Sequence, residues 1–267
     1  MVGDNNQTLK FFDYNLKFIK SEPFQIFYKD FEIFDNGRIA INASKMINYK
    51  ENNTFSKTTF NNECYSLWLY NNGEFSKYLP FDIKTFPNGS TYNELKRNFY
   101  RYKADLYYNQ PLNDTIFKIT NKDIYPTYKI DFGAFASKED LMYKPGDWVL
   151  EYFKKDHDAA YMPQNIIETD KFLKFDFIYG NRFFTGLYTK NNKECRNGEL
   201  QNDLFGLKIV LNENIGNDII SYVSPVELLK LMNDPKSINE PWFNNLKAIC
   251  ANLNENDNYL LLRFQLK

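Results

Sequence analysis

The sequence has few of the residues that carry common chemistry. It contains three cysteines among 267 residues, Cys64, Cys195 and Cys250, which are widely separated and odd in number. This spacing predicts neither a disulfide framework nor a metal centre, so we expect free structural thiols and no cofactor. His157 is the only histidine. It could be a metal ligand or a base, but without partners in the sequence we interpret it as a solvated loop residue.

Long apolar runs and charge of one sign are also absent. No apolar stretch approaches the roughly 18 residues of a membrane-spanning helix, and the first residues, MVGDNNQTLKFF, lack the apolar core of a signal peptide. The formal net charge is −1, with both signs interspersed. No basic face is therefore expected, and we do not expect nucleic acid as a partner.

Aromatic residues are abundant, with 25 Phe and 20 Tyr. Aromatic side chains favour strands because they fit a pleated, half-buried surface. The hydrophobic content of 43% with 25% charge is typical of a globular protein. We expect an all-β fold that forms one domain over residues 1–267.

The stretch 112–132, LNDTIFKITNKDIYPTYKIDF, gives the clearest local pattern. Ile116, Phe117 and Ile119 form an apolar run, and the second half alternates apolar with charged residues. Alternation with period two predicts strands with one buried face. Pro126 removes a backbone donor, which favours a strand start or an edge strand, and Gly133 is expected to end the second strand.

The same reasoning predicts further hairpins along the chain, with tight turns at the Asn-Gly pairs of residues 35–37 and 71–73. Loops are expected at residues 46–62, 82–95 and 191–201. The predicted strands are 9–12, 16–19, 24–34, 38–42, 65–70, 74–79, 99–108, 165–168, 172–179, 182–189, 208–211, 219–223 and 259–266.

Helices are expected in two places. Ser137 followed by Asp140 is an N-cap pattern that predicts a helix over residues 138–143, and a second is expected over 147–155. Ser224-Pro225-Val226-Glu227 is a capping box with proline at the first helical position. A further helix fits residues 241–253, where the apolar face consists of Trp242, Leu246, Ile249 and Leu253.

Several of these segments resemble the blade signatures of the six-bladed β-propeller family of Bacteroidetes, whose members are NHL-like and often lipoproteins. The matching segments are NDTIFKI…IYPTYKIDFG, and those at residues 172–188, 202–211, 219–232 and 256–267. The chain departs from the family at Leu207, where a glycine is usual, and at Tyr259, where a proline is usual.

This resemblance implies a β-propeller of four-stranded antiparallel blades with short helical insertions. We count about four blades plus an N-terminal hairpin. The chain would be either part of a six-bladed ring or a complete four- or five-bladed one. An incomplete ring would expose strand edges and self-associate. The resemblance also implies a periplasmic or cell-surface location, although the chain carries no lipoprotein signal and a cytoplasmic variant stays open.

The candidate site residues each have a structural alternative. Trp68, Trp148 and Trp242 could stack on sugars or peptide side chains, or they could fill the core. Glu139 and Asp140 are acids that a glycosidase could use, but they also suit the first turn of a helix. Residues 255–258, which contain Glu255 and Asp257, could suggest calcium but match turn chemistry better.

Two functions are compatible with the sequence. The first is a non-catalytic binding or interaction module for a protein or glycan ligand. The alternative is a glycan-active hydrolase or lyase with its site at the central channel, an association that rests on the family. No catalytic constellation is visible, and the GxSxG motif of the serine hydrolases is missing. The sequence therefore favours the binding module and assigns no catalytic or ligand-binding residue.

Overall fold

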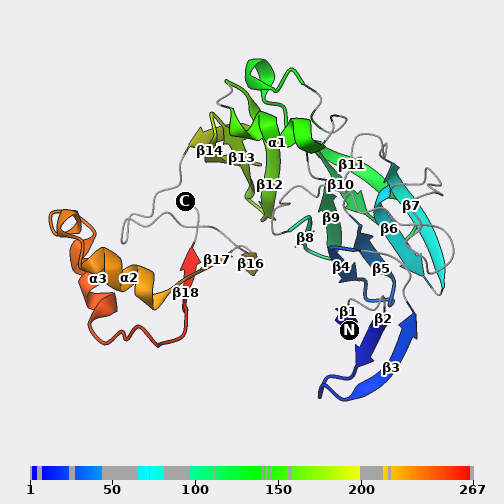
Figure 1. Cartoon of the computed structure of the whole chain (residues 1–267), viewed down its shortest axis with the longest axis horizontal. Helices are drawn as coiled ribbons and strands as arrows, with labels where there is room; N and C mark the ends of the chain where they lie inside the picture. The colour runs from blue at the N-terminus through cyan, green and yellow to red at the C-terminus, as the bar shows by residue number, and fades with distance from the viewer. Residues whose placement is uncertain are drawn as a thin grey trace.

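The computed structural model describes residues 2–4, 8–23, 28–43, 65–71, 73–80, 97–110, 112–139, 141, 144, 146–155, 158–198, 213–215 and 218–264. In these ranges the chain is mainly β-structure with a few short helices, as the aromatic content predicts. The described strands form five antiparallel sheets, each built from strands that follow one another in the sequence. Figure 1 shows these sheets one after another along an arc.

The first sheet consists of β1 (Val2–Asp4), β2 (Thr8–Phe12) and β3 (Phe18–Pro23). The predicted hairpin between β2 and β3 is confirmed, and β1 adds a strand that the sequence pattern did not reveal. Asp13 holds the turn between them, because its Oδ1 accepts hydrogen bonds from the backbone N–H groups of Asn15 and Lys17 at 2.9 and 2.8 Å.

The second sheet contains β4 (Asp30–Ile33), β5 (Ile39–Asn42), β6 (Tyr65–Asn71) and β7 (Glu74–Pro80). Both predicted turns are present. Gly37 and Gly73 have φ values of 81° and 90°, which glycine adopts without steric cost. The loops predicted at residues 46–62 and 82–95 lie outside the described residues.

One strand prediction is wrong in the third sheet. Residues 99–108 do not form a single strand but a hairpin of β8 (Phe99–Tyr102) and β9 (Asp105–Asn109). The turn has no glycine, proline or asparagine; Lys103 takes the left-handed conformation itself, with φ of 55°. The sheet continues with β10 (Thr115–Ile119) and the edge strand β11 (Ile124–Lys129). Pro126 lies on that edge, beside a register shift, as its missing donor requires.

The fourth sheet consists of β12 (Ala160–Glu168), β13 (Phe172–Tyr179), β14 (Arg182–Thr189) and β15 (Glu194–Gly198). The prediction of a loop at residues 191–201 is wrong for β15. This strand is at the sheet edge, and its side chains are almost all exposed. An exposed edge strand needs no apolar alternation, so the period-two signal was missing.

The connection between the third and fourth sheets carries the 3₁₀-helix η2 (Gly133–Phe135) and α1 (Gly146–Lys154). The helix predicted over 147–155 is confirmed with a shift of one residue. Of the helix predicted over 138–143, Lys138 and Glu139 form a bend and Leu141 has 3₁₀ conformation, while residues 140, 142 and 143 lie outside the described residues. The Ser137 hydroxyl accepts the Glu139 N–H at 3.3 Å.

The C-terminal sheet consists of β16 (Glu213–Ile215), β17 (Asp218–Val223) and β18 (Leu260–Phe264). Between β17 and β18 lie α2 (Pro225–Met232), η4 (Pro235–Ser237) and α3 (Phe243–Cys250). Glu227 accepts a hydrogen bond from the Ser224 N–H at 3.2 Å, as the capping box predicts. The apolar face of α3 uses buried Leu246 and Cys250, whereas Ile249, which the sequence placed on that face, is 37% exposed.

The hydrophobic core lies between consecutive sheets. Leu9 of the first sheet packs with Ile39 and Ile41 of the second. Leu67 and Leu69 of the second pack with the third, and the third contributes Ile116 to a cluster with Phe175 of the fourth. The described strands close into no barrel. The first four sheets pack against one another in sequence order, whereas the C-terminal sheet packs on α2 and α3. None of the described helices is long and apolar enough to cross a membrane.

A buried polar network also joins the second and third sheets. Asn42 donates from Nδ2 to Asn98 Oδ1 at 2.8 Å and accepts from the Tyr108 hydroxyl at 3.0 Å. Asn98 in turn donates to the Asn109 carbonyl at 2.9 Å. Buried amides stabilise a fold only when they are hydrogen-bonded, so these partners fix how the two sheets meet.

Candidate functional site

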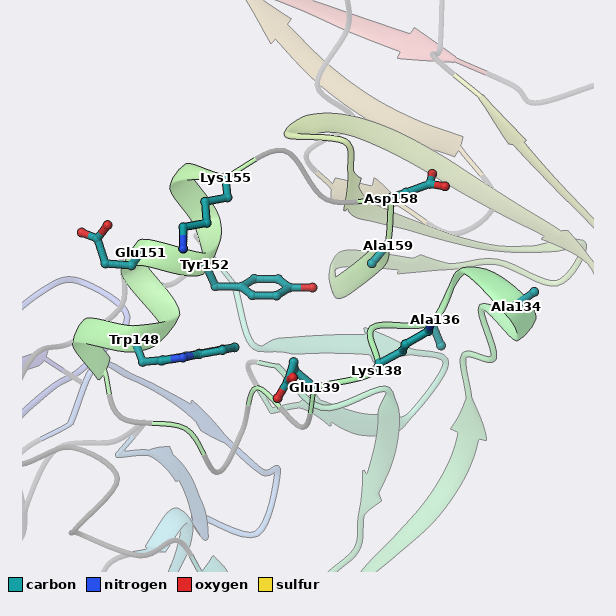
Figure 2. A pocket seen from close by; sticks show the side chains of 10 residues that line it. All are labelled: Ala134, Ala136, Lys138, Glu139, Trp148, Glu151, Tyr152, Lys155, Asp158 and Ala159. Atoms are coloured by element: carbon teal, nitrogen blue, oxygen red, sulfur yellow. The ribbon is translucent and has the colours of Figure 1, made fainter.

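A pocket of about 470 Å³ lies between α1 and the segment that leads from η2 toward it. Figure 2 shows the side chains that line it. They come from the 133–139 segment, from α1 and from the start of the fourth sheet, and they are Ala134, Ala136, Lys138, Glu139, Trp148, Glu151, Tyr152, Lys155, Asp158 and Ala159. We call this cavity the α1 pocket.

Two aromatic rings form one wall of the α1 pocket. Trp148 and Tyr152, one helical turn apart, stack with centroids 5.3 Å apart and project from the same side of α1 (Figure 2). Tyr152 is buried, and its hydroxyl lies 3.1 Å from Ser137 Oγ. Trp148 is 38% exposed, and the Lys144 ammonium lies 4.9 Å from its ring centroid. Tyr152 thus holds Trp148 in place while leaving part of the indole open.

Each carboxylate of the α1 pocket has a partner. Glu139 pairs with Lys144 at 2.7 Å, and Glu151 pairs with Lys154 at 2.6 Å. The hydrogen bond from Lys154 lowers the pKa of Glu151 below its ordinary value. Asp158 accepts a hydrogen bond from the Tyr179 hydroxyl, and Figure 2 shows its carboxylate turned away from α1. Each of the three carboxylates is therefore already engaged by a side chain of the protein.

A second cavity of about 480 Å³ adjoins the first and shares Ala136, Lys138 and Glu139 with it. Its other walls come from the β9–β10 turn, with Asn113 and Asp114, and from the first residues of β12. The contact between Ser137 Oγ and the Tyr152 hydroxyl joins the linings of the two cavities. Together they offer room for a ligand larger than one small ring.

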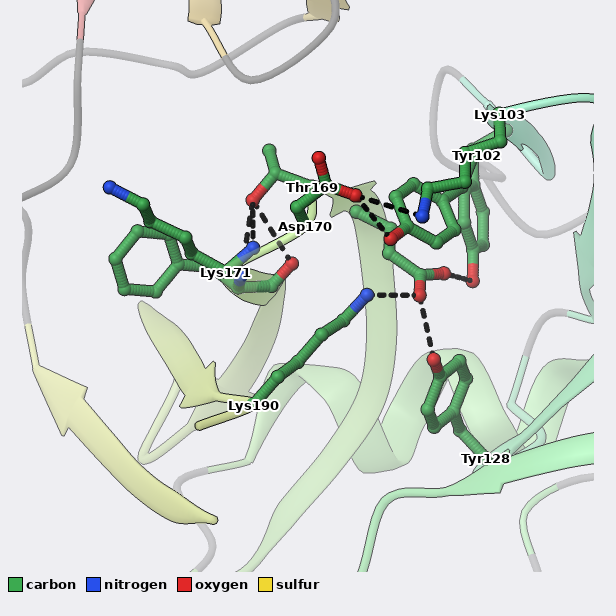
Figure 3. A network of polar contacts seen from close by, with 10 residues as sticks. Tyr102, Lys103, Tyr128, Thr169, Asp170, Lys171 and Lys190 are labelled. Carbon is green, nitrogen blue, oxygen red and sulfur yellow. Dashed lines mark hydrogen bonds and ion pairs between the residues drawn. The ribbon is translucent and has the colours of Figure 1, made fainter. Parts of the chain in front are cut away.

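A separate polar cluster lies around Glu168, the last residue of β12. Figure 3 shows this cluster, with Tyr128 and Lys190 labelled. The Glu168 carboxylate is fully buried. It pairs with Lys190 at 2.6 Å and accepts hydrogen bonds from the hydroxyls of Tyr128 at 2.6 Å and Tyr100 at 3.1 Å. Beside it, Asp170 accepts a hydrogen bond from Tyr102 at 2.8 Å.

Burial is the main reason why the pKa of Tyr100 and that of Tyr128 are raised, and the neighbouring Glu168 adds to the effect. The same causes raise the pKa of Tyr107 to about 12. These phenols therefore stay protonated and act as donors toward the carboxylate. Tyr100 and Tyr128 come from the third sheet and Glu168 comes from the fourth, so the Glu168 cluster links these two sheets.

The fourth sheet holds one more buried ion pair. Lys174 has a side chain only 1% exposed and pairs with Asp176 at 2.7 Å. Burial lowers the pKa of Lys174, and Asp176 opposes that shift. Asp176 also accepts hydrogen bonds from Thr185 at 2.7 Å and from Asn165 at 3.1 Å. The pair is satisfied within its own sheet, which indicates a structural role.

The structure places the candidate residues of the sequence analysis in different environments. Trp68 is buried, and its Nε1 donates to the Tyr65 carbonyl at 3.1 Å, so it fills the core. Trp242 packs against the α2 and α3 cluster. Trp148 and Glu139 both line the α1 pocket. His157, Asp140 and Cys64 lie outside the described residues.

The remaining candidates are structural. Asp257 accepts the Asn254 N–H at 2.7 Å, which is turn chemistry. Cys195 is exposed and Cys250 buried, and both are free thiols. Within the described part of the chain, no group of three or more His, Cys, Asp or Glu side chains could hold a metal ion.

Sequence reasoning missed Tyr152, Lys138 and Lys155. A signal for Tyr152 exists, because residues four apart share one helix face and Trp148 precedes it by four. Lys138 and Lys155 carry no local signal. They reach the same pocket only because the 133–139 segment returns beside α1.

Comparisons with known proteins give the fold and a family. The structure resembles that of a Bacteroides fragilis NCTC 9343 protein whose name describes it as a candidate exported protein. The TM-score is 0.70 with 14% sequence identity, over 98% of this chain and 72% of that chain, so the likeness concerns the fold. A family model described as "Domain of unknown function (DUF4934)" matches residues 1–265. No curated protein matched the chain.

Proposed function

The chain belongs to the DUF4934 family of domains of unknown function, and we propose that it is a non-catalytic binding module whose ligand is a glycan. The observation that carries the proposal is the α1 pocket, where a partly exposed tryptophan lies among charged side chains. Flat aromatic rings stack on the apolar faces of sugars, and charged groups bind sugar hydroxyls through charge-assisted hydrogen bonds.

The scaffold of this proposal is a β-propeller formed by residues 1–267 as one domain, with the sheets as blades of a partial ring. Its support is the repetition of antiparallel sheets in sequence order along an arc (Figure 1), with the first four packed one against the next. Four strands per sheet in the second, third and fourth sheets fit the blade of that fold.

Binding is favoured over catalysis by the pairing within the pocket. A glycosidase needs one carboxyl with a raised pKa as general acid. Here Glu139, Glu151 and Asp158 each accept a bond from a lysine or a tyrosine. The hydrogen bond from Lys154 lowers the pKa of Glu151, which is the opposite of what a general acid requires.

A periplasmic or cell-surface location completes the proposal. It is supported by the name of the structurally similar Bacteroides fragilis protein, which describes that protein as a candidate for export. Glycans meet proteins mainly outside the cytoplasm, so location and ligand class are consistent with each other.

The test is a glycan array followed by calorimetric titration of the hits against the wild type and Trp148→Ala. We expect Trp148→Ala to weaken binding about three- to tenfold, the effect of one aromatic contact. Phe183→Ala is the matched control, because Phe183 is 62% exposed on β14 but does not line the pocket. Equal losses in both variants would contradict the site. Glycan turnover that disappears in Glu139→Gln would contradict a non-catalytic role.

A further inference from the structure

In the α1 pocket the carboxylates are paired, whereas two lysines of the lining are not paired with any described residue. Its carboxylates are engaged by Lys144, Lys154 and Tyr179. Lys138 and Lys155 are exposed, and within the described residues neither ammonium makes a hydrogen bond or an ion pair within 4.0 Å. The ammonium groups of Lys138 and Lys155 are therefore available to a ligand, whereas each carboxylate of the pocket already has a partner.

The two lysines reach the pocket from different walls. Lys155 directly follows α1, and Lys138 belongs to the segment across from it (Figure 2). Lys155 already acts on its surroundings, because its charge contributes to lowering the pKa of Glu151. The pocket lining also holds three carboxylates, two of which are paired with Lys144 and Lys154. When those two partners are counted with Lys138 and Lys155, four cations stand against three anions, and this excess of positive charge favours a ligand with a negative group.

We infer that the ligand is an acidic glycan, a sugar chain that carries carboxylate or sulfate groups. This inference rests on the proposed function and adds the charge of the ligand. The sugar ring contacts the exposed part of Trp148, and the anionic group is bound by Lys138 and Lys155. The adjoining cavity along Asn113 and Asp114 receives the next units of the chain.

The experiment compares three oligosaccharides of equal length: a uronate, a sulfated one and a neutral one. Each is titrated calorimetrically against the wild type at low and at high salt. We expect at least one acidic glycan to bind about tenfold more tightly than the neutral one, with a preference that shrinks as salt screens the charges. The uronate and sulfate arms identify which anionic group is recognised.

The variants Lys138→Gln and Lys155→Gln remove the charges with little change in shape. Each is expected to reduce the acidic preference about three- to tenfold while leaving neutral binding unchanged. Lys247→Gln, an exposed lysine on α3, is the matched control. Circular dichroism and thermal melts verify that all variants are folded.

The possible results distinguish a failure of the preference for acidic glycans from a failure of glycan binding itself. Neutral glycans that bind as tightly as acidic ones, or acidic binding that ignores both lysine substitutions, would overturn the inference and leave glycan binding intact. Failure of all three glycans to bind would overturn the proposed function and the inference with it.

Discussion

Gly186 lies within β14, where the Phe175 ring of β13 covers the position that a side chain would occupy. A Cβ atom at residue 186 would overlap that ring. Phe175 is itself buried between the third and fourth sheets, so it has no free space into which it could move. The packing of Phe175 between the sheets therefore requires a residue without a side chain at position 186.

We predict that Gly186→Ala lowers the free energy of unfolding by about 1–3 kcal/mol, the usual cost of overpacking a core. Urea unfolding followed by tyrosine and tryptophan fluorescence measures the change. Gly198→Ala on β15 is the control, because a Cβ there meets nothing within 4 Å. If both variants lose the same free energy of unfolding, overlap with the Phe175 ring is not the cause of the loss.

At the residue scale the sequence reveals a site only in part. The sequence offers Trp68, Trp148 and Trp242 as equal candidates, and only the structure places Trp148 at a pocket and buries Trp68. Nothing around Lys138 or Lys155 distinguishes them from other surface lysines. Their role depends on the approach of two segments 17 residues apart, which tertiary packing decides and local pattern does not.

Among the elements, turns with strong local chemistry were predictable and those without it were not. Asn36-Gly37 encodes its turn because glycine adopts positive φ freely. Lys103 adopts φ of 55° with no such signal, since pairing of β8 with β9 imposes it. In the same way β15 has exposed polar side chains, and its strand structure comes from pairing with β14. Both errors arise where a neighbouring strand decides the conformation.

The Glu168 cluster joins elements that the sequence cannot bring together. Tyr100 belongs to β8, Tyr128 to β11 and Glu168 to β12, while Lys190 follows β14. We predict that Lys190→Met lowers the free energy of unfolding by about 3 kcal/mol, because the buried Glu168 carboxylate then lacks its counter-charge.

The double variant Glu168→Gln/Lys190→Met should recover part of this loss, since an amide costs less to bury than an unbalanced charge. A double-mutant cycle of urea unfolding measures the coupling, for which we expect about 1–3 kcal/mol. Lys193→Met, an exposed lysine in the same turn between β14 and β15, is the control. Additive effects of the two substitutions would show that Glu168 and Lys190 do not stabilise each other.

At the scale of the whole molecule, three hydrophobic clusters of the described residues join neighbouring sheets, and the outermost sheets each have one neighbour at most. One face of the C-terminal sheet packs on α2 and α3 through Val223 and Leu260. On the other face Tyr222 and Leu261 are paired across strands and are 52% and 69% exposed. At the opposite end of the arc, Phe18 and Ile19 of β3 are also more than half exposed.

These exposed apolar strands lie at sheet edges, β3 in the first sheet and β18 in the last. An open edge with apolar side chains pairs readily with another chain. We therefore predict that the protein self-associates as its concentration rises, measured by multi-angle light scattering.

Ile19→Lys and Leu261→Lys should each shift the population toward monomer, because a charge at an edge opposes strand pairing. Phe183→Lys, an equally exposed aromatic within β14, should leave association unchanged. A monomer at every concentration would instead mean that these edges are protected without a partner, and would count against a partial ring.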